Sequence, residues 1–408
     1  MLYRLEVENF LSIRDRQVLD LTIAPNVPDP DNRYAPIFAG SELRAPKVIA
    51  LYGKNASGKT NVLRALEVIA TLARAPQPQQ GWPVALDRFN DEDSCEREMR
   101  FAIELGGAMN LSPSVMERID AAAEVEWGLY RYELVLEVKG GFVTRIQEEA
   151  LRQKPNGHGK WQRVFERDVD GQIKDSQSFS ISGFKHLLNT LGPTVSVLSS
   201  FAHFQHPTAQ LFVRIANDVT FSSALGMHFA DDQPIISYLS KAPPMVAALN
   251  RDLGRIDVGI EGMRFVETPQ GPQAAFRHAG LQVEMPWALQ SQGTRKFIKV
   301  FPWIAGSLQS GGIAVIDELD TAVHPAVLPE ILRWYYNPER NPNDAQVWFT
   351  CHAASLLDDL NKEEIVICDK DEGGRTTVHS LMDVKVRRDD NFYRKYLSGA
   401  LGGVPQIG

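Results

Sequence analysis

The sequence predicts an α/β protein whose core is interrupted by a long middle segment. Short apolar runs near both ends of the chain, such as KVIALYG from Lys47 and GIAVID from Gly312, have the composition of strands buried on both faces. VWFT and EIVIC are two further runs of this kind, and segments of helical or loop character separate them. Strands that alternate with helices near both ends indicate one α/β core that is split by the middle of the chain.

The middle of the chain follows two other patterns. A connection rich in Pro, Gln and Asp leads into strands with alternating polarity, and KGG and the pair Asp170–Gly171 are predicted to form hairpin turns. Beyond residue 183 apolar positions recur at three and four residues, which is typical of helices. We therefore predict a split core at 1–75 and 281–408, a β-rich subdomain at 76–182 and a mainly helical insertion at 183–280.

The composition excludes several classes of protein. Hydrophobic residues make up 44% and charged residues 23%, close to the average of globular domains, so neither disorder nor a fibrous class is indicated. No apolar run reaches the roughly 18 residues of a membrane-spanning helix, and early charges such as Arg4 and Glu6 interrupt any signal-peptide core, which predicts a cytoplasmic protein. The three cysteines lack metal-site spacing and are predicted to be reduced. The net charge of −8 leaves nucleic-acid binding neither shown nor excluded.

The segment GKNASGKT, from Gly53 to Thr60, fits the phosphate-binding pattern G-x-x-x-x-G-K-[ST] between a predicted strand and an amphipathic helix. Gly53 and Gly58 permit a turn whose backbone N–H groups face a phosphate. Lys59 is suited to the β and γ oxygens of ATP, and the Thr60 hydroxyl to Mg²⁺. A glycine-rich turn with a chance Lys-Thr pair is the alternative. The predicted ATP-binding residues are Gly53, Lys54, Asn55, Ala56, Ser57, Gly58, Lys59, Thr60 and Asn61.

Two further groups of polar residues follow apolar strands. Asp317 ends the run GIAVID and Glu318 follows it, at the edge where open α/β sheets bind ligands. Asp317 is predicted to hold Mg²⁺ with Thr60, and Glu318 to orient and polarise the water that attacks the γ-phosphate. His352 follows VWFT and is predicted to hydrogen-bond the γ-phosphate as a second catalytic residue.

These elements, in this order, resemble the ABC class of ATPases, which includes transporters and the SMC, RecF and OLD proteins. In ALQSQGTRKF, Ser291, Gly293 and Thr294 look like the S-x-G-T signature of the soluble relatives. The resemblance implies an ATPase head that pairs head to tail with a second copy, whose signature contacts the γ-phosphate. A polar loop that caps a helix would use the same residues. The predicted fold is a P-loop ABC-type ATPase head with an antiparallel β subdomain and a helical insertion.

The resemblance extends to DTAVHP, which looks like the D-loop of this class and supplies Asp320, Thr321 and His324. The class also has a Q-loop glutamine, for which Gln147 and Gln205 are candidates, although an ordinary surface glutamine fits either position.

The ending YLSGALGGVP is similar to the Y-L-x-G-x-x-G-x-x-P ending of bacterial ABC-type ATPases from abortive-infection and antiphage operons, such as the AbiL, RloA and PARIS AriA groups. Members of these groups act beside a second protein, commonly a TOPRIM-like nuclease. The resemblance implies an ATP-dependent dimer that controls such a partner effector in antiphage defence. The alternatives are a RecF- or SMC-like clamp on DNA in DNA repair and an ATP-stabilised scaffold with little turnover.

Three other motifs have plainer interpretations. HFQH, with His203 and His206, could pair on zinc but has no further ligands nearby. DKDEGG from Asp369 is interpreted as a hairpin turn rather than a metal loop. The basic and aromatic residues from Lys385 onwards could contact nucleic acid or form an amphipathic docking helix. Both interpretations fit these residues, and we rank the helix slightly higher.

Overall fold

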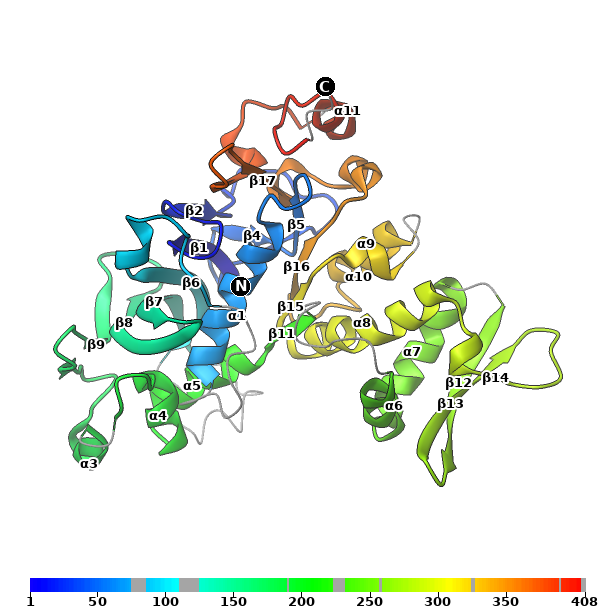
Figure 1. Ribbon diagram of the computed structural model, residues 1–408, viewed down its shortest axis with the longest axis horizontal. Helices are drawn as coiled ribbons and strands as arrows, with labels where there is room; N and C mark the ends of the chain where they lie inside the picture. Colours follow the sequence, from blue (N-terminus) through cyan, green and yellow to red (C-terminus); the bar gives the residue numbers. More distant parts are fainter. Residues whose placement is uncertain are drawn as a thin grey trace.

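The computed structural model describes residues 1–74, 86–109, 125–188, 191–222, 232–256, 259–323, 327–388 and 390–404. Its architecture is a six-stranded, largely parallel sheet beside a seven-stranded antiparallel sheet, with one helix between them and others on the outer faces (Figure 1). This confirms the predicted α/β class with an antiparallel β layer.

The parallel sheet carries the segments that the sequence marks as buried strands. Its strand order is β11-β15-β16-β5-β17-β18, and β18 alone runs antiparallel to its neighbour. The strands are β5 (Val48–Tyr52), β11 (Val219–Ser222), β15 (Ile313–Ile316), β16 (Gln346–Thr350), β17 (Ile365–Lys370) and β18 (Thr376–Ser380). Because β5, β15 and β16 are parallel neighbours, the residues that follow them meet at one edge of the sheet.

The antiparallel sheet has the order β10-β9-β8-β7-β6-β1-β2. Its strands are β1 (Leu2–Glu8), β2 (Gln17–Asp20), β6 (Met99–Met109), β7 (Glu126–Lys139), β8 (Phe142–Pro155), β9 (Gln162–Arg167) and β10 (Ile173–Lys174). The predicted turns at KGG and at Asp170–Gly171 are confirmed: Gly140, Gly141 and Gly171 have positive φ and connect antiparallel partners.

The sheets cross the predicted division of the chain. Strand β1, from the segment placed with the core, pairs with β2 on one side and with β6 of the predicted β-rich subdomain on the other. Strand β11, from the predicted helical insertion, joins the parallel sheet beside β15. These strand pairings depend on hydrogen bonds between distant segments, which local sequence patterns do not predict. The boundaries themselves stay a prediction.

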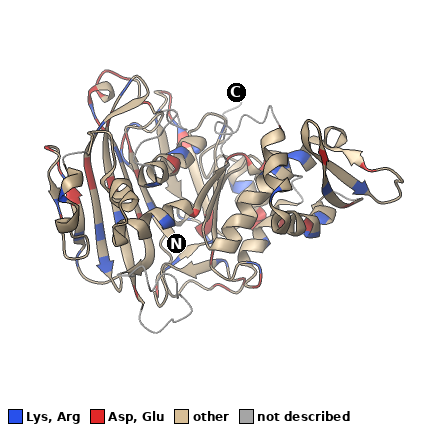
Figure 2. Ribbon diagram, turned by 90° about the horizontal axis from the view of Figure 1, so that it is seen from below, with Lys and Arg blue, Asp and Glu red and all other residues tan. Residues whose placement is uncertain are grey.

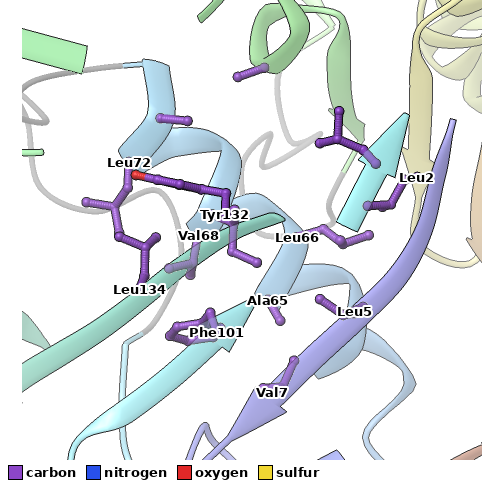
Figure 3. Packing of buried hydrophobic residues seen from close by; sticks show 14 of the residues in the cluster. Leu2, Leu5, Val7, Ala65, Leu66, Val68, Leu72, Phe101, Tyr132 and Leu134 are labelled. Atoms are coloured by element: carbon purple, nitrogen blue, oxygen red, sulfur yellow. The ribbon is translucent and has the colours of Figure 1, made fainter. Parts of the chain in front are cut away.

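Helix α1 (Lys59–Arg74) fills the space between the two sheets. Its residues Ala65, Leu66, Val68 and Leu72 pack among side chains of the antiparallel sheet in one buried cluster (Figure 3). The other side of this cluster includes Trp348 and other residues of the parallel sheet. Truncation of Leu66 or Leu72 to alanine would cost about 2–5 kcal/mol of stability, since each is almost fully buried.

The opposite face of the parallel sheet belongs to a second buried cluster. Several helices contribute to this cluster, among them α7 (Pro243–Ile256), α8 (Gln292–Ser310) and α10 (Leu328–Tyr336). Along β5 the residues alternate between the clusters, with Ile49 and Leu51 on the α1 side and Val48, Ala50 and Tyr52 on the other. Burial on both faces explains the continuous apolar run.

The remaining elements extend these layers. Helices α4 (Val197–His203) and α5 (Pro207–Asn217) contact α1, while α3 (Lys185–Leu188) and α6 (Gln233–Ser240) are short. A three-stranded sheet of β12 (Ile260–Thr268), β13 (Gly271–His278) and β14 (Met285–Pro286) projects from one side of the molecule (Figure 1). We refer to residues 259–290 as the arm.

Local sequence patterns miss strands at two places. Strand β13 was not predicted, because its GPQAAFRH sequence has weak strand character. The second place lies before β5, where the chain forms the short pair β3 (Tyr34–Pro36) and β4 (Arg44–Pro46). Short pairs of this kind are stabilised by tertiary contacts rather than by their own sequence.

Candidate nucleotide site

The turn between β5 and α1 is shaped by two close approaches. Gly53 has φ +152°, and a Cβ there would lie 2.2 Å from the carbonyl oxygen of Cys368. Gly58 has φ +100°, and a Cβ there would lie 2.3 Å from Thr376 Oγ1. Both glycines are therefore required by contact with the β17–β18 hairpin as well as by the backbone conformation.

Lys59 begins α1 with its side chain folded back over this turn. Its Nζ donates hydrogen bonds to the carbonyl oxygens of Gly53 at 2.8 Å and Lys54 at 3.1 Å. Burial lowers the pKa of Lys59, and nearby acidic groups, including Asp317, partly oppose this shift. The amino group is thus held at the mouth of the turn, where a phosphate oxygen would be its natural partner.

Asp317 and Thr60 come together from different elements. Thr60 Oγ1 lies 3.0 Å from Asp317 Oδ2, at the end of β15. Hydroxyl and carboxylate oxygens are ligands that Mg²⁺ prefers, so this predicted pair is placed as a magnesium site requires.

Thr350, the last residue of β16, is a site residue that sequence reasoning missed. Its Oγ1 donates to Asp317 Oδ1 at 2.5 Å and accepts from the backbone N–H of Glu318 at 2.7 Å. Glu318 itself is exposed and adopts a left-handed conformation, with φ 52°. The available signal was the position of Thr350 at the carboxyl end of a parallel strand, beside the strand of Asp317.

Asp320 fixes the loop that carries His352. Its Oδ2 accepts the backbone N–H of His352 at 2.9 Å and that of Ala353 at 3.0 Å. The side chain of His352 is exposed. Thr321 Oγ1 donates to the carbonyl oxygen of Glu318, and His324 lies outside the described residues.

These groups line one open cavity of about 690 Å³, within the usual range for ligand pockets. Its lining residues are Asn55, Ala56, Ser57, Gly58, Lys59, Thr60, Asn61, Asp317, Glu318, Thr321, Thr350, His352 and Lys370. The structure therefore brings together most of the predicted residues of the three motifs, whereas Gly53 and Lys54, at the start of the turn, do not line the cavity. Lys370 is a further lining residue that the sequence did not indicate.

The geometry of the cavity fits a nucleoside triphosphate with Mg²⁺. The glycine turn opens its backbone at the start of α1, where the helix dipole favours an anion. Ser57 Oγ is buried without a hydrogen-bond partner in the structure. An acceptor such as a phosphate oxygen would satisfy it, and Thr60 and Asp317 would hold the metal ion.

The predicted signature residues do not line this cavity. Ser291 caps the N-terminus of α8, where its Oγ accepts the backbone N–H of Thr294 at 3.0 Å. Ser291 and Gly293 are exposed, whereas Thr294 is buried. The capping interpretation is thus correct, and the exposed face of the cap stays open to another molecule.

The candidates for a Q-loop glutamine lie elsewhere. Gln147 is on β8 and contacts Glu137, and Gln205 is in the turn between α4 and α5. Neither lines the cavity, so neither occupies the position that the resemblance requires.

The other motifs have structural roles. His206 is buried, stacks on Phe179 at 4.1 Å and caps α5, and the described residues hold no cluster of three or more His, Cys, Asp or Glu side chains suited to a metal ion. DKDEGG forms the predicted turn between β17 and β18. Helix α11 (Phe392–Leu397) packs through Phe392 and Tyr396.

Together, the fold and the cavity define a protein with a P-loop, whose glycine turn between β5 and α1 is suited to nucleotide phosphates. The chain matches, over residues 48–107 and 171–358, the family described as "AAA domain, putative AbiEii toxin, Type IV TA system". This match spans more than half of the chain, which therefore belongs to that family. The chain is also similar, at 13% identity and a TM-score of 0.38, to the SMC head domain from Thermotoga maritima, over 94% of this chain and 99% of that chain. No curated protein matches it. Among the described residues, no helix is both long and apolar enough to cross a membrane.

Proposed function

We propose that the protein is an ATP-driven switch, in which two heads close on two ATP molecules and open after hydrolysis. One observation carries this proposal: the cavity gathers the P-loop, Asp317, Glu318 and His352, while the signature residue Ser291 stands exposed outside it. A site of this class needs a signature, and a second copy of the chain would supply it.

The predicted site residues have separate roles in binding and hydrolysis. Lys59 and the N–H groups of the P-loop hold the phosphates, and Thr60 and Asp317 hold Mg²⁺. When bound, Mg²⁺ neutralises charge on the phosphate oxygens. Glu318 is exposed at the cavity wall and orients and polarises the attacking water, and His352 donates to the γ-phosphate.

The split site explains how ATP would drive closure. A ligand shifts a conformational equilibrium only by its difference in affinity for the two states. In the closed dimer a γ-phosphate contacts both Lys59 of one head and Ser291 of the other, and in the open state it contacts one head alone. Hydrolysis removes the shared group and weakens the closed state.

The consequence of closure is proposed to be control of a partner effector in antiphage defence. The description of the family, which names a toxin and a toxin–antitoxin system, supports a role beside a second protein. A TOPRIM-like nuclease is the partner class that the ending YLSGALGGVP implies.

A DNA clamp receives less support from the described surface. The antiparallel sheet carries basic and acidic residues beside one another (Figure 2). Arg131 contacts Glu6, Glu104 and Glu133 within 2.8 Å. Paired charges of this kind do not form the continuous basic strip that binds a phosphate backbone.

The test is the mass of Glu318→Gln in solution, measured by light scattering with and without ATP and Mg²⁺. This variant retains the groups that bind ATP and loses the carboxylate that acts on water, so we expect slow turnover and an ATP-dependent rise in mass. Wild-type hydrolysis is measured alongside. A mass that stays monomeric with ATP bound would overturn the dimeric switch.

Lys59→Ala is the control for nucleotide binding. It removes the amino group of Lys59, which is predicted to bind the phosphates of ATP. ATP affinity and the rise in mass should therefore both disappear. Unchanged affinity in this variant would show that the nucleotide binds elsewhere.

A further inference from the structure

We propose that the segment Asn391–Val404, called here the tail, positions the P-loop and the His352 loop, so that ATP affinity depends on contacts behind the phosphate turn. The tail consists of α11 and a glycine-rich turn, and none of its residues lines the cavity. This inference rests on the proposed role of the cavity as an ATP site.

The first contact is between two glycines. Gly403 is buried with φ +72°, and a Cβ there would lie 3.2 Å from the Cα of Gly53 and 3.1 Å from Cγ2 of Ile367. Gly53 also lies against the carbonyl oxygen of Cys368. The first residue of the P-loop is therefore held between β17 and the tail, with no room for a side chain at Gly53 and only tight contact for a methyl group at Gly403.

The second contact joins the tail to both loops of the site. The ring of Tyr396 packs edge-on against Tyr52 at 5.8 Å, and its hydroxyl donates to the carbonyl oxygen of Gly403 at 3.1 Å. Tyr52 in turn donates to the carbonyl oxygen of Ala353 at 3.3 Å, directly after His352. One aromatic pair thus connects the glycine turn of the tail, the end of β5 and the His352 loop.

The third contact is polar. Lys54 Nζ donates to the carbonyl oxygen of Lys370 at 2.9 Å and lies 3.4 Å from Asp369 Oδ1. Burial would raise the pKa of Asp369, but hydrogen bonds from the backbone N–H groups of Lys370 and Gly403 outweigh it and lower the pKa. The Asp369 carboxylate, which pairs with Lys54, is therefore itself held by the tail.

These contacts predict a specific effect on nucleotide binding. The backbone N–H groups of a P-loop stabilise phosphate only in one arrangement, and Gly53 sets where that arrangement begins. A shift of a few tenths of an ångström at Gly53 would misdirect these donors without unfolding the core. Gly403 and Tyr396 are thus positioning residues that act through Gly53.

The chain offers a matched pair of substitutions to test this. Gly403→Ala adds a methyl group against Gly53, and Gly399→Ala adds the same group at φ +77° in the same turn, where nothing lies within 4 Å. Both variants carry the same cost of a left-handed alanine. Only the first disturbs the P-loop.

The experiment measures the dissociation constant of a fluorescent ATP analogue with Mg²⁺, and the melting temperature, for the wild type and both variants. We expect similar melting temperatures in the two variants and about tenfold weaker binding in Gly403→Ala alone, since small misplacements of binding groups cost such factors. Equal affinities in the two variants would overturn the role of the tail. Failure of the wild type to bind the analogue would instead overturn the proposed ATP site.

Tyr396→Phe provides a second test if Gly403→Ala does not fold. It keeps the ring on Tyr52 and removes only the hydrogen bond to Gly403, so the fold is retained and the affinity for the analogue should fall. Unchanged affinity in a folded Tyr396→Phe protein would also overturn the inference.

Discussion

At the scale of single residues, Thr350 shows how a neutral side chain can organise charged ones. Its hydroxyl contacts the carboxylate of Asp317 and the backbone N–H of Glu318, so it fixes the Asp317 side chain and the backbone at Glu318. The sequence signal for this residue is limited to its position at the end of a predicted strand. Only the pairing of β15 with β16 reveals its role.

Thr350→Val keeps the shape of the side chain and removes its hydrogen bonds. We expect a fall in the ATP hydrolysis rate of about tenfold or more and a requirement for more Mg²⁺, because losing a hydrogen bond to a charged group costs about 1.5–3 kcal/mol. Steady-state rates over a magnesium titration measure both effects. An unchanged magnesium requirement would remove Thr350 from the metal site.

Glu67 on α1 is a buried carboxyl group whose ionisation destabilises the fold. It is buried, and burial raises its pKa to about 7, although Arg74 and Arg64 oppose the shift. Because its pKa is higher in the folded state than its ordinary value of 4.5, its contribution to stability is present below pH 4.5. That contribution is lost as the pH rises towards 7.

Glu67→Gln should therefore raise the free energy of unfolding at pH 8 by about 1–3 kcal/mol and leave it nearly unchanged at pH 4.5. Denaturant unfolding at the two pH values measures the difference. The same gain at both values would show that packing, rather than ionisation, governs this position.

At the scale of elements, the N-terminus of α8 combines two roles in one residue. Ser291 stabilises the helix as its N-cap, and its exposed position makes it the proposed contact for the γ-phosphate of a partner. A substitution that separates the two roles is therefore more informative than a simple truncation. Aspartate is such a substitution, because it is as good an N-cap as serine.

Ser291→Asp should keep the free energy of unfolding within about 0.5 kcal/mol of the wild type. Its negative charge should nevertheless repel the triphosphate and abolish the ATP-dependent rise in mass. Ser291→Ala is the control, since it should lose about 1 kcal/mol from the cap without adding charge. Retention of the rise in mass by Ser291→Asp would exclude a signature contact at this helix.

At the scale of the whole molecule, the cavity and the signature belong to different parts of one chain. The cavity lies at the edge of the parallel sheet, whereas α8 follows the arm on the outer face of that sheet (Figure 1). Two defective chains should therefore restore each other if the sites are shared between copies.

We expect a mixture of Lys59→Ala and Ser291→Asp to hydrolyse ATP when neither variant does so alone. In a mixed dimer the Ser291→Asp chain supplies the cavity and the Lys59→Ala chain the signature, so activity should approach about a quarter of the wild type. The rate is measured against the ratio of the two proteins. A mixture as inactive as its components would indicate that each chain works by itself.

Much of the site could be predicted from the sequence, because its motifs are short and local. The turn from Gly53 to Thr60 needs particular residues at fixed spacing, and the runs before Asp317 and His352 mark the ends of buried strands. The hairpins at Gly140 and Gly171 are set by their glycines. In each case neighbouring residues alone impose the physical requirement.

The remaining features depended on the tertiary structure, because they arise between segments far apart in the chain. The pairing of β1 with β6, the position of Thr350 and the contact of Gly403 with Gly53 all join distant residues. The sequence by itself determined the phosphate turn, the buried strands beside it and the glycine hairpins, since these follow from local sterics and periodic burial. The tertiary structure alone decided which segments meet, because hydrogen bonding between strands and close packing select one partner among many compatible ones.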